Sequence, residues 1–154
     1  MLLYRIAKAE HIRDLSGTGA RAYGGRWNHK GIPVVYTSES RSLAALEYLV
    51  HTNFTNLPDN LQIAGIEVPP DALHLEIPAT DLPAGWRDYP PPLSLADIGT
   101  DWAKSGRSFL LKVPSAVMPR ESNIIINCLH PDLRRIDIAE VEDFEFDRRL
   151  FPDF

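Results

Sequence analysis

The sequence predicts an α+β domain built on a compact, mixed and largely antiparallel sheet. Three observations support this fold class. The chain has 154 residues, which is the usual length of one domain. Several short apolar runs have the character of strands, whereas only one segment has strong helical periodicity. Strands and helices also lack the regular alternation of parallel βαβ folds. We therefore expect a single domain over residues 1–154.

The N-terminal part of the chain is expected to contain two short strands separated by a turn and a loop. Leu2–Ile6 and the run PVVY at 33–36 have the apolar character of short strands. The stretch AEHIRDL at 9–15 indicates a helical turn. Residues 16–25 contain four glycines, so we expect a loop there.

The strong helical pattern covers residues 40–53, with Ser38 or Ser40 as the expected N-cap and Asn53 near the end. Three residues at helical spacing form its expected apolar stripe, namely Leu43, Leu46 and Val50.

The remainder of the chain is expected to be rich in strands. Alternating or continuous apolar runs predict strands at 61–68, 72–77, 109–114, 122–129 and 134–146. The proline-rich segment 78–92 is expected to be irregular and at the surface, and residues 95–107 to form a broken helix.

Composition and charge narrow the possible functions. The net charge of −5 argues against a broad basic surface, so we expect no direct contact with nucleic acid. The single cysteine, Cys128, permits neither an internal disulfide nor a cysteine-based zinc site, and the five histidines lack metal-ligand spacing, so no metal site is expected. The apolar N-terminal run is too short for a signal peptide and no stretch has the length of a membrane span, which predicts a cytoplasmic protein.

Glu47 is the first candidate for chemistry. It lies at the edge of the apolar stripe of the expected helix, where a carboxylate needs a partner because burial of an unpaired charge is costly. It either forms a buried salt bridge, occupies a partly exposed edge position, or is directed into a pocket.

Arg26 is the second candidate, because it follows two glycines in the motif GGRWN at 24–28. Glycines permit positive φ angles and the close approach of a ligand, and a guanidinium is a planar set of donors suited to phosphate. The motif is therefore either an anion-binding site or a glycine turn with an exposed arginine over Trp27. Arg5, at the end of the first strand, could face the same cavity.

Polar residues at strand ends complete the candidate set, since pockets are often lined there. Tyr36 ends PVVY, Ser115 follows FLLKVP, and Ser122 and Asn123 begin SNIIIN. The alternatives are a core position for Tyr36 and turn chemistry for the serines and amides.

These residues belong to motifs that follow one another along the chain: YRI with Arg5, GGRWN with Arg26, VVYTS with Tyr36, ALEYL with Glu47, VPSA with Ser115 and ESNIIIN with Asn123. In this order, and over residues 3–151, they resemble the RES-domain toxins of bacterial RES–Xre type II toxin–antitoxin pairs. The family is named for an arginine, a glutamate and a serine. Either Ser115 or Ser122 could be that serine, and we prefer Ser115 because VPSA directly follows a buried strand.

The resemblance implies a fold similar to that of ADP-ribosyltransferase toxins, with a mixed, mostly antiparallel sheet around a cleft. It implies a toxin that depletes NAD+ by hydrolysis or phosphorolysis of the nicotinamide–ribose bond, with NAD+ as a substrate and no separate cofactor. It also implies a helical Xre-like antitoxin whose C-terminal end occludes the cleft.

Each candidate then has an expected role. Glu47 would stabilise the oxocarbenium-like ribose cation, and Arg26 and Arg5 would hold the pyrophosphate. Tyr36 would stack on nicotinamide or ribose, while Ser115 would bind the ribose or position the carboxylate. Asn123 is a further candidate for substrate binding. In the empty cleft, we expect the two arginines to balance the charge of Glu47.

Three other functions remain open at this point. The same residues would serve an ADP-ribosyltransferase that modifies a host protein. The chain could instead be a non-catalytic binding module for a nucleotide or a protein. A toxin that attacks nucleic acid is disfavoured by the net charge.

Overall fold

The computed structural model describes residues 1–152 of the chain. In chain order the strands are β1 (Leu2–Lys8), β2 (Val34–Ser38), β3 (Leu61–Glu67), β4 (His74–Glu76), β5 (Leu110–Pro114), β6 (Ser122–Asn127) and β7 (Asp137–Asp143). The helices are α1 (Thr18–Tyr23), α2 (Arg41–Val50) and α3 (Leu93–Ser105), and short 3-10 turns lie at Phe54–Asn56, Ala79–Asp81, Pro131–Arg135 and Arg148–Leu150.

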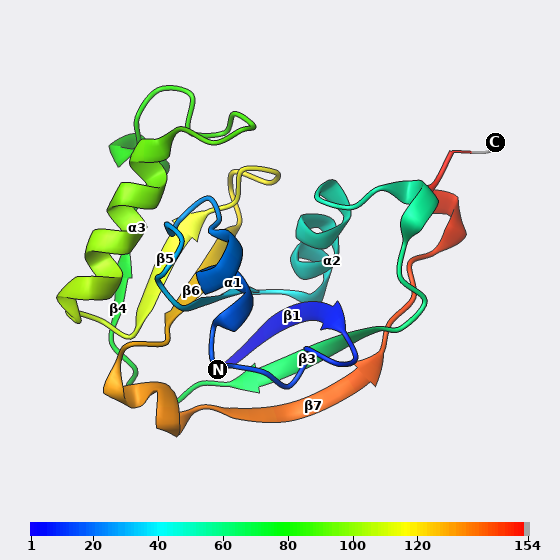
Figure 1. Ribbon diagram of the computed structural model, residues 1–154, viewed down its shortest axis with the longest axis horizontal. Helices are drawn as coiled ribbons and strands as arrows, with labels where there is room; N and C mark the ends of the chain where they lie inside the picture. The colour runs from blue at the N-terminus through cyan, green and yellow to red at the C-terminus, as the bar shows by residue number, and fades with distance from the viewer. Residues whose placement is uncertain (153–154) are drawn as a thin grey trace.

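All the strands belong to one sheet with the order β4-β5-β6-β2-β1-β3-β7 (Figure 1). Only β4 and β5 are parallel, and every other neighbouring pair is antiparallel. The predicted α+β domain with a mixed, mostly antiparallel sheet is confirmed.

The sheet is weakly joined in its middle. β1 pairs with β3 along its whole length, and β2 pairs with β6 along its whole length. In contrast, a single register pair, Tyr4 opposite Ser38, joins β1 to β2. The sheet therefore divides into the halves β4-β5-β6-β2 and β1-β3-β7, and α2 packs against both strands at the division.

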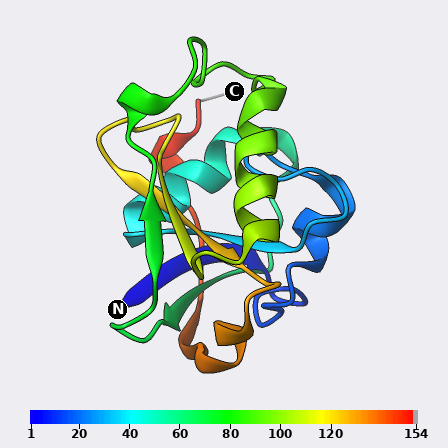
Figure 2. The same cartoon turned by 90° about the vertical axis from the view of Figure 1, so that its left-hand side faces the viewer.

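The core follows the two-residue period of the strands. In β6, Ile125 packs beneath α3 with Trp102 and Trp27, whereas Ile124 and Ile126 belong to a second cluster that includes residues of β3 and β5. A view from the side shows α3 lying along β5 and β6 (Figure 2). A third cluster joins α2 to β1, β3 and the C-terminal segment.

Two predicted elements differ from the structure. The glycine-rich stretch 16–25 contains the helix α1, which the glycines flank more than they interrupt: Gly17 and Gly24 lie just outside its ends with φ angles of 77° and 72°. Glycine at such positions accommodates positive φ at low cost. The predicted broken helix is the continuous α3, because its internal Gly99 is needed for packing and does not end the helix.

No helix within residues 1–152 is both long enough and apolar enough to cross a membrane.

Gly99→Ala is expected to lower the free energy of unfolding by about 2 kcal/mol or more, because overpacking a closely packed contact is destabilising. A Cβ at Gly99 would lie 1.8 Å from the backbone oxygen of Trp27, so α3 and the loop before β2 would have to separate. Denaturant unfolding of the purified protein measures the change. The matched control is Gly19→Ala in α1, where a Cβ meets no atom within 4 Å. Equal stability of Gly99→Ala and wild type would contradict the close contact.

Candidate active site

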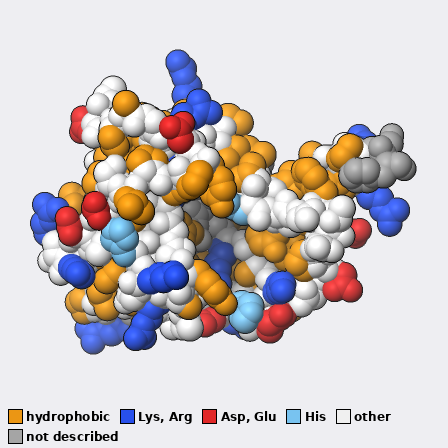
Figure 3. All heavy atoms as spheres, turned by 45° about the horizontal axis from the view of Figure 1, so that its top comes forward, with side chains coloured by type: hydrophobic (Ala, Val, Ile, Leu, Met, Phe, Trp, Pro, Cys, Tyr) orange, Lys and Arg blue, Asp and Glu red, His pale blue; other side chains and the backbone are white. Residues whose placement is uncertain are grey.

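A cavity of about 720 Å³ opens where the sheet divides, between β1, β2 and α2. The space-filling view shows this hollow between the two halves of the molecule, with apolar side chains around it and basic side chains inside (Figure 3). Five of the predicted site residues line it, namely Arg5, Arg26, Tyr36, Glu47 and Asn123. Ser115 does not line the cavity and lies directly behind Glu47.

Glu47 reaches the cavity because α2 turns one face toward the division. Ser40 caps the helix by accepting the N–H of Leu43, as one of the two predicted caps. Ala44, Glu47 and His51 recur at helical spacing and all line the cavity.

The apolar stripe predicted for α2 is partly wrong. Val50 is 51 % exposed, and the buried residues of the helix are Leu43 and Ala44. The burial is shifted because α2 packs over both β1 and β2 at the division of the sheet.

Two uncharged donors hold the Glu47 carboxylate by the same oxygen. The Ser115 hydroxyl donates to Oε1 at 2.6 Å, and the Asn123 amide nitrogen donates to Oε1 at 2.7 Å. Within residues 1–152, no side chain or backbone group donates to Oε2 and no basic group forms an ion pair with Glu47. The expectation that the arginines balance this carboxylate is confirmed in part: the charge of Arg26 acts on Glu47 at longer range, without an ion pair, while two neutral hydrogen bonds hold the carboxylate directly.

Ser115 has two of the predicted roles: it positions the Glu47 carboxylate and it stabilises a turn. Its side chain is fully buried, and its hydroxyl also accepts the backbone N–H groups of Val117 and Met118, which is turn chemistry. A buried hydroxyl on the far side of the carboxylate can position Glu47, but it does not reach the cavity to contact a ribose. In the described part of the chain Ser122 makes no hydrogen bond to Glu47, so Ser115 is the serine that the fold brings to the glutamate.

Arg26 is held at the cavity rim by the proline-rich segment. Its Nη1 donates to the carbonyl of Trp86 at 2.6 Å and its Nη2 to the carbonyl of Asp88 at 3.2 Å. Burial lowers the pKa of Arg26, and the nearby Glu47 carboxylate is the strongest charge acting in the opposite direction. Because a guanidinium carries five N–H donors, these two bonds leave donors free for an anion.

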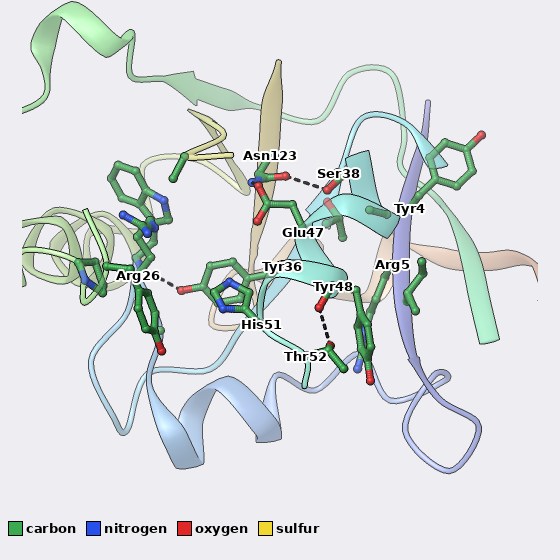
Figure 4. A pocket seen from close by; sticks show the side chains of 18 of the residues that line it. Tyr4, Arg5, Arg26, Tyr36, Ser38, Glu47, Tyr48, His51, Thr52 and Asn123 are labelled. Carbon is green, nitrogen blue, oxygen red and sulfur yellow. Dashed lines mark hydrogen bonds between the residues drawn. The ribbon is translucent and has the colours of Figure 1, made fainter. Parts of the chain in front are cut away.

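Arg5 lies on the opposite side of the cavity from Arg26, with Glu47 and Asn123 between them (Figure 4). Its guanidinium donates to the carbonyls of Asp14 at 2.6 Å and His11 at 3.3 Å. Burial lowers the pKa of Arg5 as well. Both arginines are thus fixed by backbone carbonyls and occupy the two ends of one cavity.

Tyr36 explains the second glycine of GGRWN, Gly25. Its hydroxyl accepts the backbone N–H of Trp27 at 3.0 Å and donates to the Asn28 amide oxygen at 2.6 Å. A Cβ at Gly25 would lie 2.7 Å from this hydroxyl, so only glycine fits there. Burial raises the pKa of Tyr36, which keeps the phenol protonated as a donor. Tyr36 therefore anchors the loop that carries Arg26, while its ring lines the cavity.

Trp27 is 3 % exposed and belongs to the core, in agreement with the expectation that it packs, and it also borders the cavity. Sequence reasoning missed Asn28 and Ser38. Asn28 is buried and donates to the carbonyls of Ala20 and Ile32, which ties the loop together. In the sequence, the only indication of this role for Asn28 is that a polar residue occurs inside the motif GGRWN.

Residues 1–152 contain no group of three or more His, Cys, Asp or Glu side chains arranged to hold a metal ion. The polar side chains of the cavity are instead a carboxylate, two guanidinium groups, the imidazole of His51, the amide of Asn123 and several hydroxyls. This set suits a ligand that carries both anionic groups and a site of developing positive charge.

The fold and this cleft define the chain as an α+β domain with a polar cleft where its mostly antiparallel sheet divides. More specifically, the chain belongs to the RES-domain family, because the family described as "RES domain" matches residues 2–148. The chain is 42% identical over 146 residues to the "Prs ADP-ribosylating toxin" of Sphingobium sp. (strain YBL2), which covers 94% of this chain and 91% of that protein. It is 38% identical to "Toxin Res" of Yersinia enterocolitica, with 97% of this chain and 99% of that protein covered.

Among solved structures, the chain is similar to one from the MbcT–MbcA toxin–antitoxin complex of M. tuberculosis. The TM-score is 0.69 at 20% sequence identity, and the match covers 93% of this chain and 83% of that one. This similarity supports the fold.

Proposed function

We propose that this RES-domain protein is the toxin of a toxin–antitoxin pair and that it consumes NAD+ by cleaving the nicotinamide–ribose bond. The observation that carries the proposal is the Glu47 carboxylate, which is held by one oxygen and lies in a cavity flanked by two guanidinium groups.

The chemistry of NAD+ suits such a site. Nicotinamide leaves as a neutral molecule from a positively charged ring, so the reaction needs no general acid. It needs stabilisation of the oxocarbenium-like cation that forms on the ribose as the bond stretches. The Oε2 atom of Glu47, which accepts no hydrogen bond within residues 1–152, supplies negative charge for that purpose, while Ser115 and Asn123 keep the carboxylate in place.

The remaining roles follow from position. Arg26 donates its remaining N–H groups to the pyrophosphate, and Arg5, at the other end of the cavity, binds another polar part of the dinucleotide. The ring of Tyr36 forms the wall against which nicotinamide or ribose packs. Ser115 acts by positioning Glu47. The substrate resides in the cytoplasm, and we propose that the toxin acts there.

The second candidate reaction is ADP-ribosylation of a host protein, because the relative with 42% identity is named an ADP-ribosylating toxin. In that reaction, a side chain of a host protein attacks the same cation in place of water or phosphate. The exposed rim residues Tyr23 and Tyr89, which border the cavity, would then contact the protein acceptor. The catalytic groups are the same in both cases.

The experiment is incubation of the purified protein with NAD+ labelled in its adenylate half, with and without phosphate and bacterial extract. Free labelled ADP-ribose indicates hydrolysis, and a phosphorylated ADP-ribose indicates phosphorolysis. Label attached to protein indicates transfer. Intact NAD+ under all conditions would contradict the proposal. The remaining interpretation would then be a non-catalytic binding module.

We further propose that an Xre-like antitoxin covers the cleft; in support, the structural neighbour comes from a toxin–antitoxin complex. Induction of the protein alone should stop bacterial growth as NAD+ falls, and co-expression of the cognate antitoxin should restore both. An antitoxin that restores growth while NAD+ remains low would contradict occlusion of this site.

A further inference from the structure

A third polar side chain stands behind the two that hold Glu47. The Ser38 hydroxyl, at the end of β2, donates to the amide oxygen of Asn123 at 2.7 Å, and the amide nitrogen of Asn123 donates to Glu47 (Figure 4). Ser38 and Asn123 are directly opposed in the register of β2 and β6. Ser38 is 3 % exposed, and within residues 1–152 its hydroxyl forms no other side-chain hydrogen bond.

We propose that Ser38 is a positioning residue for Glu47 that acts through Asn123; this inference rests on the proposed NAD+-consuming function. Ser38 does not touch Glu47. It determines how the amide that does touch Glu47 is held.

The argument begins with the two ends of the amide. An ionised carboxylate only accepts hydrogen bonds, so the amide nitrogen of Asn123 must face Glu47 and its oxygen must face away. That oxygen then needs a donor in a half-buried site, and Ser38 is the donor. Without it, the amide oxygen is unsatisfied, which is costly, and the amide turns toward water in the cavity.

Ser38 is also well placed to be rigid. It is the β2 residue in the single register pair that joins β1 to β2, so it lies where the sheet divides and the cavity begins. On its other side β2 pairs with β6 along its whole length, and this pairing holds Ser38 opposite Asn123. The chain Ser38–Asn123–Glu47 therefore fixes one carboxylate oxygen from the floor of the cleft and leaves the other for the substrate.

Ser38→Ala is expected to lower kcat for NAD+ consumption about tenfold, the contribution of roughly one hydrogen bond, with KM nearly unchanged. The unchanged KM is expected because, within residues 1–152, neither Arg5 nor Arg26 forms a hydrogen bond with Ser38 or Asn123. Ser38→Thr, which keeps the hydroxyl, should restore most of kcat. If Ser38→Ala does not fold, Ser38→Cys replaces it, since a thiol has similar size but is a weak donor.

The decisive measurement is a double-mutant cycle. If Ser38 acts through Asn123, Ser38→Ala should slow the enzyme no further once Asn123→Ala is present. The control is Ser108→Ala, which removes another buried serine hydroxyl that donates to a backbone carbonyl, that of Leu110, outside the cavity. It should lower stability and leave kcat as in wild type.

Three results would overturn the assignment: wild-type kcat for Ser38→Ala, a rise in KM alone, or effects of the two substitutions that multiply. The proposed function fails separately, through full turnover in Glu47→Gln. An inactive Glu47→Gln together with a fully active Ser38→Ala would remove only the role of Ser38.

Discussion

Glu47→Gln is expected to lower NAD+ turnover by about two orders of magnitude or more while NAD+ binding is largely kept. The loss has the size of one electrostatic stabiliser of a transition state. The amide oxygen of glutamine can still accept the bonds from Ser115 and Asn123, so the site should keep its shape. What disappears is the negative charge that stabilises the ribose cation. Initial rates of NAD+ loss and equilibrium binding measure the two parts separately.

The matched control for this variant is Glu39→Gln. Glu39 lies just before α2 and pairs at the surface with Lys112, 3.1 Å away. The same chemical change there should leave turnover as in wild type, because Glu39 does not line the cavity. Parent-rate turnover by Glu47→Gln would end the assignment of this carboxylate.

Arg26→Lys is expected to weaken NAD+ binding by about ten- to hundredfold, because a point charge cannot reproduce the planar set of donors. In the free protein, Arg26 already gives two donors to the carbonyls of Trp86 and Asp88, so it organises the rim as well as the pyrophosphate site. Lysine has three donors at one atom and cannot span both carbonyls and a phosphate. Titration calorimetry with NAD+ on a catalytically inactive Glu47→Gln background measures the affinity without turnover.

Loss of the rim contacts alone could also weaken binding, and Arg87→Lys tests this. Arg87 fastens the same proline-rich segment by donating from Nε to the carbonyl of Ala116, but it does not line the cavity. Affinity should fall strongly for Arg26→Lys and little for Arg87→Lys. Equal effects would show that Arg26 acts by holding the segment, and an unchanged affinity for Arg26→Lys would exclude its role with phosphate.

The candidate site was predictable from the sequence to the extent that each residue has a local signature. Arg26 follows two glycines, Tyr36 ends an apolar strand, and Glu47 lies at the edge of a helical stripe. These signatures, with the resemblance to the RES family, identified five residues that line one cavity. Local patterns did not reveal Ser38 or Asn28, because a single serine or asparagine near a strand has several ordinary uses.

The partners of the candidate residues were not predictable in the same way. The side chains that hold Glu47 directly are Ser115 and Asn123, which lie 68 and 76 positions away along the chain. Arg26 is held by a carbonyl 60 positions along the chain. Local sequence patterns cannot predict which hydrogen-bonding group the fold brings to a residue from so far along the chain.

The sequence by itself determined the elements and their chemistry: strands from two-residue alternation, α2 from its periodicity with Ser40 as its cap, and a cleft protein with one carboxylate and two guanidinium groups from the ordered motifs. These depend on interactions within a few residues or on family pattern. Tertiary structure alone decided that the sheet divides at Tyr4 and Ser38, that Ser115 and not Ser122 meets Glu47, and that α1 forms inside a glycine-rich stretch. The physical reason is that these outcomes depend on which distant surfaces pack together, and packing is selected by the whole chain at once.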